Sequence, residues 1–110
     1  MVTVLTVELA LKAIAEPRRQ EILRLVWSQE RPAGEIATHF DVSRPAISRH
    51  LRVLRDAGLV EERRRGTQRL YRARPEPILE MRRFLEGFWD EGLLAIKQAA
   101  EADSKGGRRR

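Results

Sequence analysis

The sequence predicts a mainly α-helical fold with one small β-hairpin. Three observations support this prediction. Apolar residues recur at helical spacing, two strand-like runs flank a glycine within residues 59–74, and prolines and glycines fall between these segments. With 110 residues the chain has the length of one domain. We expect that domain to span residues 1–101, with a disordered basic tail at 102–110.

Two helices are predicted in the first 28 residues. Apolar residues of the first helix recur at steps of three and four, at Val4, Val7, Leu11 and Ile14. Thr6 is placed to cap the N-terminus of this helix. Pro17 breaks the pattern, and because proline is tolerated in the first helical turn, a second helix is expected from Pro17 to about Ser28.

A third, short helix is predicted at about residues 33–40. Arg31 and Pro32 form the connection that precedes it. The residues of this helix that are expected to point inward are Ile36, Ala37 and Phe40. Asp41 and Val42 then form a tight turn, so the third helix is joined closely to the next one.

The fourth helix, at residues 43–57, has strongly contrasting faces. Ser43 is a good N-cap, Pro45 lies in the first turn, and Gly58 ends the helix. At about 100° per residue, a narrow apolar sector is formed by Ile47, Leu51 and Leu54. The broad face beside it carries Arg44, Ser48, Arg52 and Arg55, with Arg49 at its edge. Helix surfaces usually balance their charges, so this excess of arginine indicates a binding surface.

The rest of the chain predicts a hairpin and a long helix. Strand-like runs at 59–63 and 69–73 flank a turn that contains Gly66. Two prolines then open a final helix over about residues 76–101. The order of elements is therefore α-α-α-α-β-β-α, which is the order of a winged helix-turn-helix domain. The hairpin at residues 59–74 is the wing of this domain.

The fourth helix and the wing are predicted to bind double-stranded DNA. An α-helix fits the major groove, and the first residues of a recognition helix reach the base edges. The predicted base contacts are Arg44, Pro45, Ala46, Ser48 and Arg49. Later residues of the helix and the cations of the wing suit phosphates. The predicted phosphate contacts are Ser43, His50, Arg52, Arg55, Arg63, Arg64, Arg65 and Arg69, with His50 alternatively a packing residue.

The overall charge agrees with a polyanionic partner. The chain has 22 Lys and Arg against 16 Asp and Glu, a net charge of +6. A membrane surface is disfavoured because small residues, rather than large apolar ones, stand beside the arginines of the helix. RNA is disfavoured because its narrow major groove does not admit the helix. A winged-helix protein-interaction module and a non-specific nucleic-acid-binding protein remain as alternatives.

Other classes of protein fit the sequence poorly. The absence of cysteine excludes disulfides, thiolate metal sites and a cysteine nucleophile. Neither histidine has an evident nucleophile as partner, and no phosphate-binding loop is present, so we expect no enzyme and no cofactor. No apolar run approaches the roughly 18 residues of a membrane span. We therefore expect a cytoplasmic protein.

Three stretches of the chain carry a resemblance to a known family. They are LKAIAEPRRQEILRLV (11–26), AGEIATHFDVSRPAISRHLRVLRDAGLVEERRRG (33–66) and TQRLYRA (67–73). With these residues the chain resembles the ArsR (arsenical-resistance repressor) family of bacterial winged-helix regulators. The resemblance covers about residues 8–100, and it places the family's base contacts at the same early positions of the fourth helix.

The resemblance also implies a homodimeric repressor of transcription, built from the first and last helices. The residues expected at the dimer interface are Val4, Val7, Leu11, Ile78, Met81, Leu85, Phe88, Trp89 and Ile96. Aromatic residues of the last helix, with Trp27, could alternatively line an inducer pocket. Because aromatic residues contribute strongly to interfaces, we favour the dimer seam.

Many members of the family sense metals, and here the sequence departs from them. Pro32 and Gly34 occupy the positions of the two cysteines in the thiolate motif. The last helix has no histidine for the family's other site. His39 and His50 are eleven residues apart on different helices, so they lack the spacing of a helical metal-ligand pair. We expect no metal site.

Overall fold

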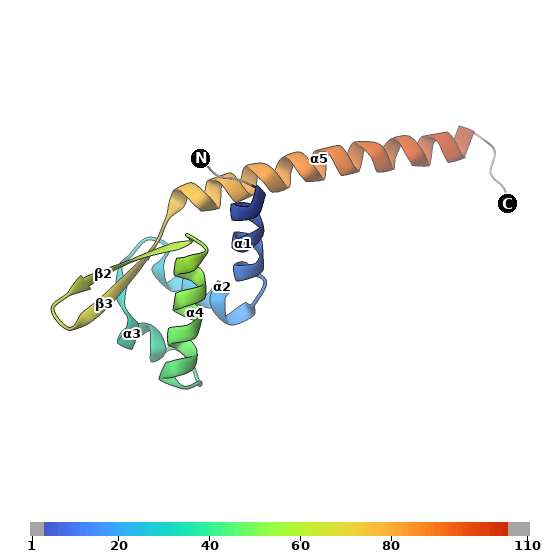
Figure 1. Ribbon diagram of the computed structural model, residues 1–110. Coiled ribbons are helices and arrows are strands. Elements are labelled where there is room, and N and C mark those ends of the chain that lie inside the picture. The colour runs from blue at the N-terminus through green and yellow to red at the C-terminus, as the bar shows by residue number, and fades with distance from the viewer. Residues whose placement is uncertain (1–3, 106–110) are drawn as a thin grey trace.

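A computed structural model of the chain describes residues 4–105, and the side chains of residues 6–104. Figure 1 shows a body of helices and a hairpin from which one long helix extends. The elements are α1 (Val4–Ile14), α2 (Pro17–Val26), β1 (Arg31–Pro32), α3 (Ala33–Ala37), α4 (Arg44–Asp56), β2 (Val60–Arg65), β3 (Gln68–Ala73) and α5 (Pro75–Lys105). This order confirms the predicted winged helix-turn-helix fold, in which α3 and α4 form the helix-turn-helix and β2 and β3 form the wing.

The wing is a two-stranded antiparallel ribbon extended by a short third strand. Val60 pairs with Ala73 at its base and Arg65 pairs with Gln68 at its tip, where Gly66 begins the turn at a φ of 63°. β1 pairs with the other edge of β3, so the strand order is β1-β3-β2. Proline has no amide hydrogen to donate, and Pro32 accordingly lies on an edge strand.

One apolar core joins all the helices to the wing. Its fully buried large residues are Ile22, Val26, Ile36, Ile47, Leu51, Leu54, Leu59 and Val60. Each large side chain buried in this way contributes about 1.5–3 kcal/mol relative to an exposed one. These residues come from α2, α3, α4 and the start of the wing, so the core holds the recognition helix and the wing in a fixed relation.

Several boundaries differ from those predicted. Thr6 lies inside α1, because the helix already begins at Val4, so the prediction of Thr6 as N-cap is wrong. Helix α3 ends at Ala37 rather than near residue 40, and the connection at 31–32 is a strand. The final helix runs to Lys105, past residue 101. Residues 106–110, the rest of the predicted tail, lie outside the described residues.

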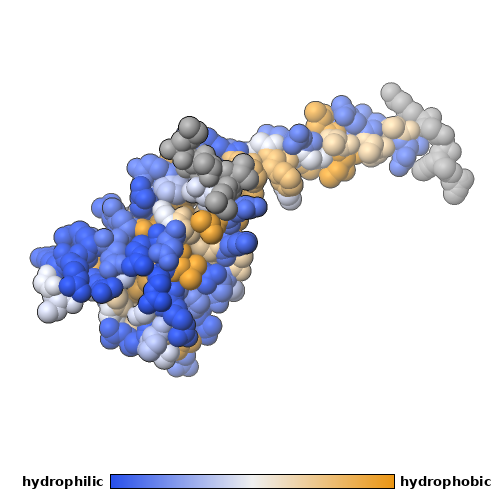
Figure 2. Space-filling model, viewed as in Figure 1, coloured by the Kyte–Doolittle hydropathy of each residue, from blue (hydrophilic) through white to orange (hydrophobic). Residues whose placement is uncertain are grey.

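The second half of α5 extends away from the body of the chain. α5 packs against α1 near its start and then leaves the body (Figure 1). Orange, hydrophobic patches follow this distal part in Figure 2, whereas the wing and its surroundings are mostly blue. Phe88, Trp89 and Ile96 are 57%, 63% and 67% exposed, which is unusual for side chains of this size in one monomer.

Candidate nucleic-acid interface

The recognition helix α4 is fixed on the body by its apolar sector and capped at its start. Ile47, Leu51 and Leu54 are at most 1% exposed. The Ser43 hydroxyl accepts a hydrogen bond of 3.2 Å from the amide of Ala46, which confirms Ser43 as the N-cap. The first turn is therefore presented to solvent as an ordered helix.

Gly58 turns the chain from α4 into the wing. Its φ of 79° lies in the left-handed region that favours glycine. The amide of Gly58 donates to the carbonyl of Arg55 over 2.9 Å, and the amide of Leu59 donates to that of Leu54 over 2.9 Å, a Schellman arrangement. The end of α4 thus determines where β2 begins.

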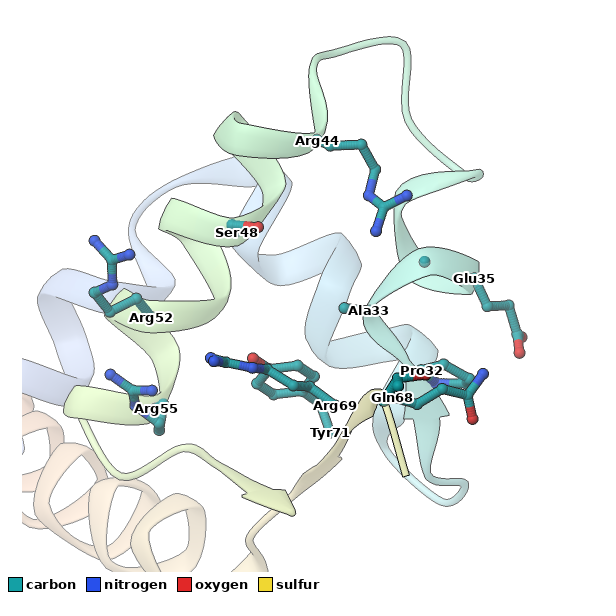
Figure 3. Close-up of a pocket in the computed structure, with 12 residues that line it drawn as sticks. Pro32, Ala33, Glu35, Arg44, Ser48, Arg52, Arg55, Gln68, Arg69 and Tyr71 are labelled. Carbon is teal, nitrogen blue, oxygen red and sulfur yellow. The ribbon is translucent and has the colours of Figure 1, made fainter. Parts of the chain in front are cut away.

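A basic hollow of about 600 Å³ lies between α4 and the wing (Figure 3). Its charged lining residues are Arg44, Arg52, Arg55, Arg69 and Glu35. Arg44 and Arg69 extend into the hollow in Figure 3, while Glu35 points away from it and pairs with Arg31. The hollow therefore presents four arginines and no inward-pointing acid among its lining residues, which suits a phosphate backbone.

Glu62 of β2 holds two of these arginines in place. Its carboxylate accepts from Arg55 at 2.8 Å and lies 3.4 Å from an Nη of Arg69, and its side chain is only 15% exposed. Asp56 is a second partner of Arg55, at 3.2 Å. These hydrogen bonds, first with Glu62 and then with Asp56, raise the pKa of Arg55. The guanidinium groups are thus oriented before any ligand binds.

The same carboxylate lies beside the buried Tyr71, its cross-strand neighbour. Burial raises the pKa of the Tyr71 hydroxyl, and the negative charge of Glu62 raises it further. Tyr71 therefore stays neutral at the floor of the hollow, where it also forms part of the lining.

The cations at the wing tip fall into two groups. Arg63 makes two hydrogen bonds to Glu30, of 2.6 and 2.8 Å, which lower the pKa of Glu30. These bonds tie β2 to the segment before β1. Arg64 and Arg65 are exposed, and neither forms an ion pair with an acid within residues 6–104. They are therefore the freer cations of the wing.

His50 lies on the side of α4 that faces α1 and α2. Its Nδ1 is 3.3 Å from Nη1 of Arg19, and because a guanidinium only donates, Nδ1 is the acceptor and the proton is on Nε2. Burial lowers the pKa of His50, Glu16 opposes this effect, and the charges of Arg19, Arg18 and Arg49 lower it further. The ring therefore packs as a neutral group in the free protein.

The residues predicted to contact bases all lie in the first half of α4, but Ala46 and Arg44 differ from the others in exposure or direction. Pro45, Ser48 and Arg49 are exposed on the outer face of α4, and Ala46 is half-buried. The guanidinium of Arg44 reaches back over α3 and lies close to Gly34. If Gly34 were replaced by alanine, the added Cβ would lie 3.8 Å from Nη2 of Arg44. Arg44 is therefore closer to the hollow than to the tip of the helix.

The residues predicted for the dimer interface divide into two sets. Val7 and Met81 are 6% exposed and belong to the packing between helices of one protomer, where Leu11 and Ile78 are half-buried. Leu85, Phe88, Trp89 and Ile96 are exposed on α5. The side chain of Val4 lies outside the described residues.

Sequence reasoning missed the acidic partners of the arginines. Glu30 and Glu62 stand beside basic residues in the sequence, but their partners lie on other elements. It also missed Arg19, whose guanidinium donates to the carbonyl of Ala13 at 2.5 Å and to that of Lys12 at 3.3 Å. For the contacts of Glu30 and Glu62 the sequence signal was the occurrence of opposite charges, and for those of Arg19 with backbone carbonyls there was none.

Within residues 4–105, no three His, Cys, Asp or Glu side chains cluster in a way that would hold a metal ion. In the same range no helix combines the length and apolar character needed to cross a membrane.

The fold and this surface define a winged helix-turn-helix regulator. Residues 16–62 match the family described as bacterial regulatory protein, arsR family. The chain is 35% identical over 94 residues to the HTH-type transcriptional regulator Rv2034 of Mycobacterium tuberculosis, covering 86% of this chain and 88% of that protein. The chain therefore belongs to the ArsR family.

Other similar proteins are also described as transcriptional regulators or as DNA-binding domains. The transcriptional repressor SdpR of Bacillus subtilis is 44% identical over 55 residues, which are 50% of this chain and 61% of SdpR. Among solved structures, an ArsR-like transcriptional regulator from Rhodococcus sp. RHA1 has a TM-score of 0.71 and 36% identity, covering 86% of this chain and 92% of that one. A homodimeric winged helix-turn-helix DNA-binding domain from Mycobacterium bovis has a TM-score of 0.63 and 35% identity, covering 78% and 80%. The agreement covers the body of the chain as well as the helix-turn-helix.

Proposed function

We propose that this ArsR-family protein is a homodimeric repressor that binds a specific operator in double-stranded DNA. In this proposal α4 reads bases in the major groove through Ser48 and Arg49, while the arginines of the hollow and the wing bind phosphates. The function is one of binding, without a catalysed reaction. It requires access to the chromosome and therefore places the protein in the cytoplasm.

The observation that carries the proposal is the arginine-lined hollow beside an exposed helix. Four arginines line this hollow between α4 and the wing, and Arg55 and Arg69 are both ion-paired with Glu62. Oriented guanidinium groups suit phosphate oxygens, and α4 has the dimensions of the major groove. A phosphate backbone in the hollow would leave the first turn of α4 facing the base edges.

The distal face of α5 supports the homodimer. Phe84 and Phe88 stack with ring centroids 6.4 Å apart, and Trp89 is 6.3 Å from Phe88. This aromatic group is exposed in a single chain, and a second copy offers an equally apolar face to cover it. Two copies would present two α4 helices, which suits half-sites one turn of DNA apart, about 34–36 Å.

The name of one relative, transcriptional repressor, supports the sign of regulation, and one solved neighbour is homodimeric. These properties are carried over to this chain as part of the proposal.

Fluorescence anisotropy tests the proposal directly. The full chain would be titrated into a labelled duplex from the promoter of its own gene and into a scrambled duplex of equal length, across a salt series. We expect preference for the promoter and an affinity that falls steeply with salt. Weak binding without salt dependence to both duplexes would contradict DNA binding, and equal, salt-dependent binding would contradict specificity.

A further inference from the structure

A second group of cations borders α4 on the side away from the wing. It comprises Lys12 at the end of α1 and Arg18 and Arg19 in the first turn of α2. Figure 1 shows the connection between α1 and α2 on one side of α4 and the hairpin on the other. Both α1 and α2 pack against α4. We call the group Lys12, Arg18 and Arg19 the α1–α2 edge.

Arg19 fixes the α1–α2 edge against the recognition helix. Its guanidinium donates to the carbonyls of Ala13 and Lys12, and it lies 3.3 Å from the His50 ring. One half-buried side chain thus joins the end of α1, the start of α2 and the middle of α4. The backbone at Lys12 and Arg18 is thereby fixed relative to α4.

Lys12 and Arg18 are exposed, and neither forms an ion pair with an acid among residues 6–104. The acid next to them, Glu16, uses its carboxylate as an N-cap and accepts from the amides of Arg18 at 2.6 Å and Arg19 at 3.1 Å. Burial acts to raise the pKa of Glu16, but these amide bonds, together with the charges of His50 and Arg19, lower it on balance. The carboxylate thus forms its hydrogen bonds with the backbone, and it forms no ion pair with Lys12 or Arg18 among residues 6–104.

Arg24 on the same helix provides a contrast. It is also exposed, but it forms an ion pair of 2.9 Å with Glu21 and lines a mostly apolar hollow between α2 and α5. Arg18, which forms no ion pair with an acid among residues 6–104, therefore lies at the end of α2 that contacts α4 through Arg19 and His50.

The geometry of DNA suggests a partner for the α1–α2 edge. A helix in the major groove lies between two phosphate backbones, because the groove is about 12 Å wide and is bounded by one strand on each side. The arginine-lined hollow accounts for one of these backbones only. With α4 in the groove, the other backbone would pass the opposite side of α4, which is the side of the α1–α2 edge.

We propose that Lys12 and Arg18 bind the phosphate backbone on the far side of the major groove, so that each protomer grips both strands that border its recognition helix. This inference rests on the proposed DNA binding. Arg19 acts as a positioning residue within this edge, and Glu16 keeps the first turn of α2 in place.

The test compares Lys12→Ala, Arg18→Ala and the double variant with two further variants. Arg24→Ala removes an equal charge from the other end of α2, and Arg64→Ala removes an exposed cation of the wing. Each purified chain would be titrated into the promoter duplex and the scrambled duplex by anisotropy between 50 and 300 mM salt, a range set by the roughly 10 Å screening length at 0.1 M. Circular dichroism would show that each variant is folded.

We expect Lys12→Ala and Arg18→Ala each to reduce the slope of log affinity against log salt by about 1, and the double variant by about 2, on both duplexes. Arg24→Ala should leave the slope as in the unaltered chain. The inference is overturned if the edge variants behave like Arg24→Ala while Arg64→Ala still lowers the slope. If the unaltered chain binds neither duplex, the proposed function itself fails.

Discussion

The carboxylate of Glu62 on β2 accepts a hydrogen bond of 2.8 Å from Arg55 on α4, and so connects the recognition helix to the wing. An acid in a DNA-binding surface opposes phosphate by its charge. Glu62 compensates for this repulsion by its position, because its ion pairs hold Arg55 and Arg69 beside the same hollow. We therefore expect Glu62 to lower the affinity for DNA of any sequence while it fixes the arrangement of the two arginines.

Glu62→Gln tests this exchange. The amide has the same size but no charge, so we expect affinity for a scrambled duplex to rise and the preference for the promoter duplex to fall severalfold. Glu61→Gln is the matched control, because Glu61 is exposed and lines a hollow beside Trp27 on the other face of the sheet. Anisotropy on both duplexes would measure the ratio. Equal ratios for the two variants would show that Glu62 acts only through its charge.

Ser48 and Arg49 are predicted to read bases. Loss of a base contact weakens binding to the correct site more than binding to random DNA, by about 1–3 kcal/mol for a good pair. Arg49→Ala and Ser48→Ala should therefore lower affinity for the promoter duplex and change affinity for the scrambled duplex far less. Arg52→Ala serves as the control, because Arg52 is predicted to contact phosphate, and it should weaken binding to both duplexes. Uniform weakening by all three variants would remove Ser48 and Arg49 from base recognition.

Much of this surface could be predicted from sequence because its determinants are local. The spacing of Ile47, Leu51 and Leu54 sets the buried side of α4, and with it the exposed position of the arginines. Ser43 and Gly58 mark the ends of the helix by their own conformational preferences. Helical periodicity contains this information within one segment.

The missed features depend on contacts between distant segments. Arg63 and Glu30 are 33 residues apart, and Arg19 and His50 are 31 apart. The pairing of β1 with β3 likewise joins residues 31–32 to residues 70–71. A two-residue strand that contains proline has no periodicity of its own, so only the presence of β3 beside it makes it a strand.

The ring of His50 gives the fold a pH dependence. Its pKa is lowered in the folded chain, chiefly by burial, and the ring is surrounded by Glu16, Arg18, Arg19 and Arg49. Protonation is then easier in the unfolded chain, whose histidine has a pKa of about 6.5. The free energy of unfolding should fall as the pH drops below about 6.5 and level off below the pKa of the folded state.

Urea unfolding at pH 7.5 and 5.5 would measure this effect. We expect His50→Gln to lose less stability between these two pH values than the unaltered chain, because glutamine does not titrate. All other titratable groups, including the second histidine, are common to both proteins. An equal loss in the two proteins would show that His50 does not contribute, and an NMR titration of the ring with a midpoint above 6.5 would contradict the direction of the shift.

The core residue Leu51 tests how the recognition helix is held. It is 1% exposed among α2, α3 and α4 residues of the apolar core. Leu51→Ala should lower the free energy of unfolding by about 2–5 kcal/mol. Val53→Ala, at an exposed position of the same helix, is the control and should change it far less. Similar unfolding midpoints for the two variants would contradict the orientation of α4.

The aromatic face of α5 is predicted to hold two protomers together. Phe88 is 57% exposed in one chain, stacks on Phe84 and lies beside Trp89. A charge introduced there would be desolvated in a dimer but solvated in a monomer, so Phe88→Glu should shift sedimentation from dimer to monomer. Arg82→Glu, also on α5 and 73% exposed, changes the net charge by two and should remain dimeric. If Phe88→Glu sediments as a dimer, another surface joins the protomers. Because a dimer binds two half-sites at once, the monomeric variant should also bind the promoter duplex more weakly than Arg82→Glu does.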